Sequence, residues 1–228
     1  MNLRTCQTNL ITFLLIIVCV FSLISCTNSE IKIKEMSSNE VLSEEKVSNS
    51  DKSNSSFITL EISSGTRARY KIKENLTRFI DPITAVGETT VVDGTIHLDS
   101  EGKIIQPSSI FVNAKTFKSD ESKRDNWIMG KGFLGDVIEL NITDVESLPW
   151  PIPETGKATF NIIGELNISN VVKPTVWVAD VGFSENSASG IAKTIITWED
   201  FQIAKPRFPF IISVDDNIAL EIDVNVTR

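Results

Sequence analysis

The chain has 228 residues, a formal net charge of −8 at pH 7 and a hydrophobic fraction of 41%. The negative charge argues against a nucleic-acid partner, because that affinity comes from Lys and Arg side chains that neutralise phosphates. It also argues against adsorption to an anionic lipid surface through a basic patch, while the hydrophobic fraction is large enough to build a core.

An apolar run over residues 10–24 predicts a signal peptide over residues 1–25. Arg4 precedes this run, which has the length of a signal-peptide hydrophobic region and is short for a membrane-spanning helix. The run ends in Leu23-Ile-Ser-Cys26, which resembles the bacterial lipobox, where a small residue precedes a cysteine that becomes lipidated. We therefore expect a bacterial lipoprotein, exported and anchored through Cys26 on the periplasmic or extracytoplasmic face of the cell envelope. An ordinary signal peptide with a chance cysteine, or an uncleaved anchor, would also fit.

Residues 26–56 are predicted to form the lipidated cysteine and a disordered tether. After the cysteine this segment has no Gly, Pro or aromatic residue and is rich in Ser, Asn, Glu and Lys. Such a composition cannot bury enough apolar surface to offset the entropy lost on ordering. The three cysteines all lie within the first 26 residues, so no disulfide or cysteine metal site is expected in the domain predicted over 57–228.

Strand patterns recur throughout 57–228, and no long helical period is present. In the stretch 157–183, apolar and polar residues alternate, pass through a turn at Ser169-Asn170 and lead into a second strand. The last strand is equally regular, with apolar residues at alternate positions from Ile218 to Val226. About eight such strands predict an all-β, antiparallel sheet, and rolling it into a barrel removes its edges and leaves room for one small ligand. A two-sheet sandwich fits the same pattern.

One short helical segment interrupts the strands. Ser119 and the two acidic residues after it predict an N-cap near the positive end of a helix dipole, followed by a helix over 123–129. Gly130 then predicts the end of the helix. Trp127 and Ile128 on this helix are expected to close one end of the barrel.

No motif predicts catalysis or metal binding. Residues 130–135 match Gly-x-Gly-x-x-Gly, but they follow a helical turn and lead into a strand, so a glycine-rich turn is a better interpretation than a dinucleotide fingerprint. The only histidine, His97, lies on the outward face of its strand beside Asp99, without the partners of a triad. Glu88 is the one acid that strand alternation places inward, and an irregularity at Gly87 would turn it outward. We therefore expect no acid pair for hydrolysis and no enzyme.

Aromatic residues give the richest functional signal. Those on the presumed inner face or in loops at its rim are Phe160, Trp177, Trp198, Phe201, Phe208 and Phe210. They would either fill a solid core or line a tunnel for an apolar chain, and the sequence pattern is compatible with both.

Several segments, taken together and in order, resemble the YceI-like family. They are AVGETTVVDGTI (85–96), TFKSD followed by KRD (116–125), VVKPTVW (171–177), EDF (199–201) and SVDDNIALEI (213–222). The resemblance extends from Gly65 to Arg228 and rests on the order and spacing of these segments.

The resemblance implies a lipocalin-like barrel that is not an enzyme and whose interior holds a polyisoprenoid chain or a related amphiphile. The residues implied to contact the lipid are Ile110, Val112, Phe160, Ile162, Ile196, Ile218 and Ile222, with Trp177, Trp198 and Phe201 deeper or near the mouth. It implies no metal and no cofactor beyond the lipid. Many members carry an isolated histidine in their first strand, and residues 70–79 contain none, so no headgroup contact is assigned.

The resulting hypothesis is a tethered, non-enzymatic barrel that binds, sequesters or carries an apolar lipid of the polyisoprenoid or isoprenoid-quinone type in the envelope. Its partners would be this lipid and the membrane that holds the anchor. Glu221, on the outward face of the last strand, is expected to play no part in binding. The alternative is a filled barrel that acts as a protein-interaction or stress-response module without a lipid, and the sequence indicates no oligomeric state.

Overall fold

The structure is a computed structural model, and it describes residues 57–130 and 134–228. The predicted signal peptide (1–25), the lipid-attachment residue Cys26 and the predicted tether lie outside the described residues. The elements of the described part are β1 (Ile58–Ile62), β2 (Arg67–Leu76), β3 (Ile83–Thr89), β4 (Val92–Leu98), β5 (Ile104–Asn113), the 3-10 turn η1 (Ala114–Thr116), β6 (Lys118–Ser119), α1 (Ser122–Gly130), β7 (Val137–Glu146), β8 (Gly156–Ile168), β9 (Val171–Ser184), β10 (Ser187–Thr197) and β11 (Ile211–Thr227).

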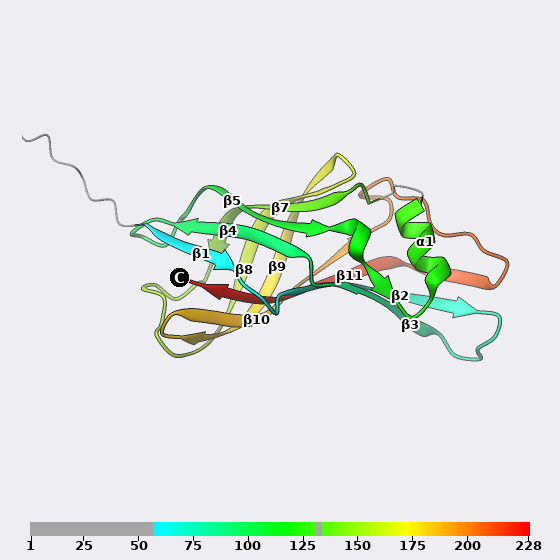
Figure 1. Cartoon of the computed structure of the whole chain (residues 1–228), viewed down its shortest axis with the longest axis horizontal. Helices are drawn as coiled ribbons and strands as arrows, with labels where there is room; N and C mark the ends of the chain where they lie inside the picture. The colour runs from blue at the N-terminus through cyan, green and yellow to red at the C-terminus, as the bar shows by residue number, and fades with distance from the viewer. Residues whose placement is uncertain (1–56, 131–133) are drawn as a thin grey trace, which may run out of the picture. The chain divides into compact units, whose positions relative to one another are not determined.

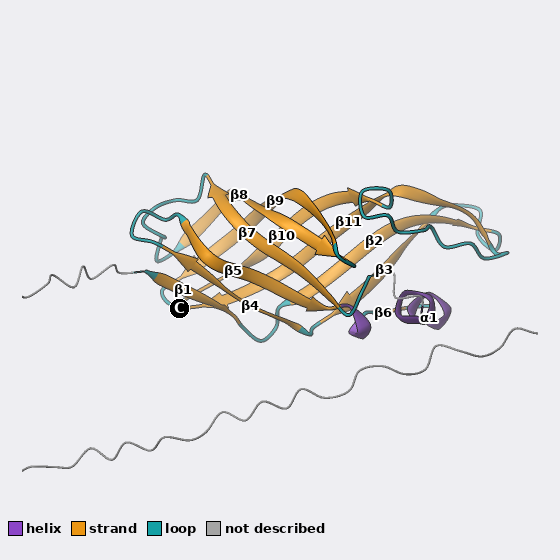
Figure 2. Cartoon of the chain, turned by 90° about the horizontal axis from the view of Figure 1, so that it is seen from above, coloured by secondary structure: helices purple, strands orange, loops and turns teal. Residues whose placement is uncertain are grey.

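Eight of these strands close into an antiparallel barrel (Figures 1 and 2). They pair in the order β1-β4-β5-β7-β8-β9-β10-β11, and β11 returns to β1 through the pairs Glu61↔Thr227 and Ile62↔Val226. The predicted closed barrel of about eight strands is confirmed, and the two-sheet sandwich is wrong. Closure pairs the edges that an open sheet would expose, and it is completed within residues 58–227.

The strand β11 is long enough to have two partners along one edge. Its last residues pair with β1, while residues 211–223 pair with β2, which pairs with β3, and β3 with β6. The β2–β3 hairpin therefore continues the barrel wall beyond the closed ring. The helix α1 lies beside β6 at this end (Figure 2).

The sequence of 86–98 alternates as a single strand would, but the segment forms the end of β3 and the whole of β4. The strand β3 ends at Thr89 and β4 begins at Val92, and the two residues between them change which positions face inward. Glu88 is exposed on the outside, where its carboxylate lies 3.4 Å from the Arg67 guanidinium. Glu88 therefore points outward, and the irregularity that turns it out lies between Thr89 and Val92 and not at Gly87, where it was expected.

The strands β8 and β9 form the predicted hairpin, paired without interruption along thirteen residues of each strand. In β8, Phe160 and Leu166 are buried, as the alternation predicted. In β9 the apolar residues occur on both faces, and the structure assigns Trp177 to the interior, where 3% of it is exposed. Val176 and Val178 face outward and are 52% and 48% exposed.

The helix α1 forms where it was predicted and is fixed by its own side chains. The Glu121 carboxylate accepts a hydrogen bond from the Lys123 backbone N–H at 3.2 Å, and the Asp125 carboxylate accepts from both the backbone N–H and the hydroxyl of Ser119 at 2.9 and 2.7 Å. Ile128 is buried in the main core, so the helix covers one end of the interior. Within 57–130 and 134–228, no helix has the length and apolar character needed to cross a membrane.

Candidate ligand-binding cavity

The barrel interior contains three adjoining hollows. The β1-end cavity, which includes Leu60 and Phe183, has a volume of about 90 Å³, and the α1-end cavity, which includes Tyr70 and Trp127, has about 70 Å³. A central cavity of about 40 Å³ lies between them. The central cavity shares Ile110, Leu140, Trp177 and Ile222 with the β1-end cavity, and Phe117, Ile138 and Leu220 with the α1-end cavity. The hollows therefore follow one another along the barrel.

The cavity walls are almost entirely hydrocarbon. Among the residues lining the β1-end cavity, those with hydroxyl or charged side chains are Ser184, Ser187 and Arg228. Such a surface offers water few hydrogen-bond partners, whereas an apolar molecule loses nothing by entering it. The arrangement is suited to a ligand with a long hydrocarbon portion.

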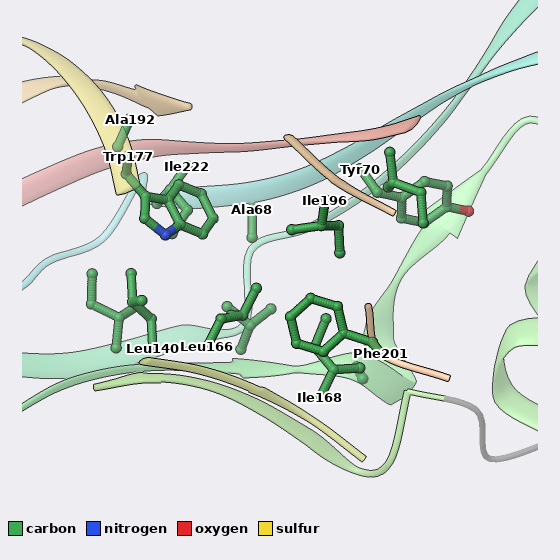
Figure 3. Close-up of a cluster of buried hydrophobic side chains, with 14 of the residues drawn as sticks. Ala68, Tyr70, Leu140, Leu166, Ile168, Trp177, Ala192, Ile196, Phe201 and Ile222 are labelled. Atoms are coloured by element: carbon green, nitrogen blue, oxygen red, sulfur yellow. The ribbon is translucent and has the colours of Figure 1, made fainter. Parts of the chain in front are cut away.

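The structure brings nine of the ten predicted lipid-contacting residues to the cavity walls. Phe160 and Ile162 line the β1-end cavity; Ile110, Trp177 and Ile222 line both that cavity and the central one; Val112 lines the central cavity; and Ile196, Trp198 and Ile218 line the α1-end cavity. The exception is Phe201, which is 2% exposed and packs in the same core near Ile168 (Figure 3) without lining any of the three hollows. That these residues contact a lipid remains a prediction.

Two tryptophans are held in place by hydrogen bonds from their indole N–H groups. Trp177 Nε1 donates to Thr175 Oγ1 at 3.0 Å, and Trp198 Nε1 donates to the Asp215 backbone carbonyl at 2.8 Å. Because the one polar atom of each ring is satisfied within the protein, the rest of the ring is available as apolar cavity wall. Figure 3 shows Trp177 beside Ile222 in the buried cluster.

Sequence reasoning missed the charged groups at the α1 end. Tyr70, Ile72 and Glu74 occupy alternate positions of β2, and all three are buried. Glu74 is therefore an acid that alternation places inward, and its phase relative to Tyr70 and Ile72 was a usable signal. Its carboxylate accepts a hydrogen bond from Arg124 Nη2 of α1 at 3.1 Å, and both side chains line the α1-end cavity.

Arg124 is the centre of this polar group. Its Nη1 donates to Asp120 at 2.7 Å and to the Ser119 hydroxyl at 3.1 Å. Burial opposes the charge of Arg124, but the hydrogen bonds to Glu74 and Asp120 outweigh that effect and raise its pKa. The buried carboxylate of Glu74 is thus matched by a cation that stays charged.

A second ionic cluster lies on the outer face of β2 and β11, and it includes Glu221. Arg69 donates two hydrogen bonds to Asp223, at 2.5 and 2.6 Å, and one to Glu221 at 3.3 Å, while Lys71 lies 2.8 Å from Glu221. Glu221 is only 8% exposed. Burial opposes its ionisation, but Lys71 and Arg69 outweigh that effect and lower its pKa. Glu221 faces outward, as predicted, and is a buried structural residue. That it plays no part in lipid binding stays a prediction.

The residues considered for catalysis do not assemble into a site. His97 Nδ1 lies 3.0 Å from the Thr59 hydroxyl, and the His97 backbone N–H donates to Ser108. Gly130 ends α1 and β7 follows, so the glycine-rich stretch, of which 131–133 lie outside the described residues, connects a helix to a strand. The described part of the chain contains no group of three or more His, Cys, Asp or Glu side chains placed to hold a metal ion.

A closed eight-stranded antiparallel barrel around an apolar interior places the protein among the lipocalin-like barrels. Within that class, residues 49–226 match the model of the YceI-like domain, so the chain belongs to the YceI-like family. The resemblance of the sequence motifs to that family is thereby confirmed.

Solved structures share the fold at low sequence identity. A polyisoprenoid binding domain from Saccharophagus degradans, implicated in plant cell wall breakdown, is 7% identical with a TM-score of 0.55, and the match covers 74% of this chain and 97% of that domain. BcnA of Burkholderia cenocepacia is 10% identical with a TM-score of 0.53, over 71% of this chain and 96% of that protein. No curated protein sequence is significantly similar to the chain.

Proposed function

We propose that this protein binds an apolar lipid inside its barrel, of the polyisoprenoid or isoprenoid-quinone type, and sequesters or carries it without chemical change. The observation that carries the proposal is the row of three adjoining hydrocarbon-lined cavities, from Leu60 at one end to Trp127 at the other. A filled barrel would have no such row.

Family membership and a shared fold support this function. The polyisoprenoid binding domain of Saccharophagus degradans has a similar fold, and the chain belongs to the YceI-like family. No nucleophile with a base and an acid to orient it is present among the described residues, which favours binding over catalysis.

Burial of hydrocarbon is sufficient to explain the affinity. Each methylene removed from water contributes about 0.8 kcal/mol, so a long isoprenoid needs few polar contacts to bind firmly. For the same reason the cavities discriminate poorly between lipid tails of different length, because one more or one fewer methylene changes the free energy of binding by only about 1–3 kcal/mol. Discrimination between ligands must therefore come from elsewhere in the molecule.

The proposed setting is the bacterial cell envelope, with the barrel tethered through a lipid on Cys26. The hydrophobic run, the small residue before the cysteine and the polar segment of 26–56 support this location. A tethered barrel would accept its ligand close to a membrane and shield it from water.

The direct test is to identify what the protein carries. The chain from Thr27 is fused to a cleavable signal peptide that has no lipobox cysteine, so that no covalent lipid confuses the result. It is exported in a bacterium, purified without detergent and extracted with organic solvent. We expect mass spectrometry to find an isoprenoid lipid at close to one molecule per barrel. Absence of any lipid, with no uptake of added isoprenoid, would favour the filled-barrel interaction module.

A further inference from the structure

One buried hydroxyl at the α1 end has no hydrogen-bond partner within the protein. Tyr70 is 5% exposed, lines the α1-end cavity and carries a phenol oxygen that is shielded from solvent and unbonded. The nearest polar side chain is Ser119, and its contact with the Tyr70 hydroxyl is weak, because the Ser119 hydroxyl already donates to Asp125 and accepts from Arg124. A buried polar group left unpaired costs about 1–3 kcal/mol, so the position calls for a partner that the protein does not supply.

The Tyr70 ring is held rigidly by its neighbours. A Cβ atom on Gly87, the residue paired with Tyr70 across β2 and β3, would lie 2.3 Å from the ring and 2.4 Å from the hydroxyl oxygen. The Phe117 ring packs on the tyrosine with 5.4 Å between centroids. Figure 3 shows the hydroxyl turned away from the hydrocarbon cluster. The hydroxyl therefore marks a fixed point where the apolar interior gives way to polar groups.

The charged groups around the Tyr70 hydroxyl already carry a net negative charge. Arg124 is bonded to two carboxylates, those of Glu74 and Asp120, and Asp125 lies beside it on α1. Two other cations lie close by. Arg78 lines a fourth hollow of about 30 Å³ that shares Glu74 and Arg124 with the α1-end cavity, and Lys123 lies over the ring of Phe210, which lines the same hollow. Glu121 also lines that hollow. A phosphate placed here would add negative charge beside a buried carboxylate.

We propose that the α1 end is the headgroup site of the bound lipid and selects a neutral group with a hydrogen-bond-accepting oxygen, such as a carbonyl, to which the Tyr70 hydroxyl donates. This inference rests on the proposed function and assigns an orientation: the headgroup lies at Tyr70 and the tail runs through the central cavity to the β1 end. Burial raises the pKa of Tyr70, so the hydroxyl remains a donor at every physiological pH.

The test uses three ligands with the same four-unit isoprenoid tail: menaquinone, which has carbonyl oxygens, the matching tetraprenyl hydrocarbon, and geranylgeranyl diphosphate. Delipidated chain from Thr27 is titrated with each, and the carbonyl stretch of bound menaquinone is read by infrared difference spectroscopy. Tyr70→Phe keeps the ring over Gly87 and removes only the hydroxyl. Phe183→Leu, in the β1-end cavity, is the matched control for loss of tail contact.

We expect wild-type protein to bind menaquinone most tightly and the diphosphate most weakly. Tyr70→Phe should weaken menaquinone about three- to tenfold, as expected for one neutral hydrogen bond, leave the hydrocarbon unchanged and shift the carbonyl stretch to higher frequency. Phe183→Leu should weaken menaquinone and hydrocarbon by the same factor. If wild type binds the hydrocarbon but Tyr70→Phe changes neither menaquinone affinity nor the carbonyl stretch, or if the diphosphate binds best, the headgroup site is wrong while lipid binding stands. If wild type binds none of the three, the proposed function itself fails.

Discussion

Both ends of the barrel interior are lined mainly by apolar side chains, and they differ in the polar groups beside the cavity. At the β1 end the cavity is walled by aliphatic and aromatic side chains such as Leu60, Phe160 and Phe183, with few polar atoms in reach. At the α1 end a buried ion pair, Arg124 with Glu74, and an unbonded tyrosine hydroxyl lie against the cavity. This difference is the basis of the proposal that the ligand is an amphiphile bound in one direction.

The largest expected effect comes from placing a charge at the apolar end. Phe160→Arg puts a guanidinium into the β1-end cavity, where no carboxylate lines the wall to pair with it, so bound lipid should be lost entirely. Lipid content by mass spectrometry is the measurement. Thr159→Arg, one residue away on the exposed face and close to Asp180, should keep its lipid. Equal lipid in the two variants, both folded by circular dichroism, would remove the β1-end cavity from the binding site.

The next effect concerns the charged pair at the α1 end. Arg124→Met leaves the buried Glu74 carboxylate without its cation and should lower the free energy of unfolding by about 3 kcal/mol. Adding Glu74→Gln to this variant should recover part of the loss, because an amide has no charge to compensate. Urea unfolding measures both. Lys103→Met, which breaks an exposed pair with Glu101, should cost far less stability because solvent screens that pair. A similar loss in both single variants would contradict a structural role for the buried pair.

A smaller effect tests the close packing of the Tyr70 ring against Gly87. Gly87→Ala places a methyl group 2.3 Å from the Tyr70 ring, so the ring must move, at a cost of about 1–3 kcal/mol in unfolding free energy and with weaker menaquinone binding. Gly182→Ala in β9 is the matched control, because its nearest neighbouring atom lies 3.7 Å away. If the two variants are equally stable and bind menaquinone equally, Tyr70 is not held as described.

The smallest effect concerns the ionic cluster on the outer face of β2 and β11. Hydrogen bonds from Arg69 lower the pKa of Asp223, and the Lys71 and Arg69 contacts lower that of Glu221. A depressed carboxylate pKa stabilises the fold above the unfolded value, about 4, and that contribution is lost as the pH falls through the lower folded value. The thermal midpoint should therefore fall steeply below about pH 4. The decline should be shallower in Asp223→Asn, and identical slopes would show that the cluster contributes nothing.

Alternation predicted the barrel well because one face of nearly every strand is buried, and a strand with one buried face leaves a period of two in the sequence. It failed where that phase changes without a visible turn, as between Thr89 and Val92, and so Glu88 was placed inward. Glu74, which follows Tyr70 and Ile72 at alternate positions, is the acid that actually faces the interior.

The cavities could not be predicted from residue types, because Phe160, Trp177 and Ile222 would look the same in a solid core. Whether they leave space depends on how side chains from eight strands meet across the barrel. The polar group of the proposed headgroup site was equally unpredictable, since tertiary packing joins Tyr70 of β2 to Arg124 of α1, fifty-four positions later in the sequence.

The most direct test of the account is a crystal structure of the protein purified from its native cells without detergent, with any bound lipid retained. We predict continuous tubular density through the three cavities, with the tail beside Phe183 and a neutral headgroup oxygen within hydrogen-bond distance of the Tyr70 hydroxyl. Cavities closed by rearranged side chains, with no density inside the barrel, would contradict it.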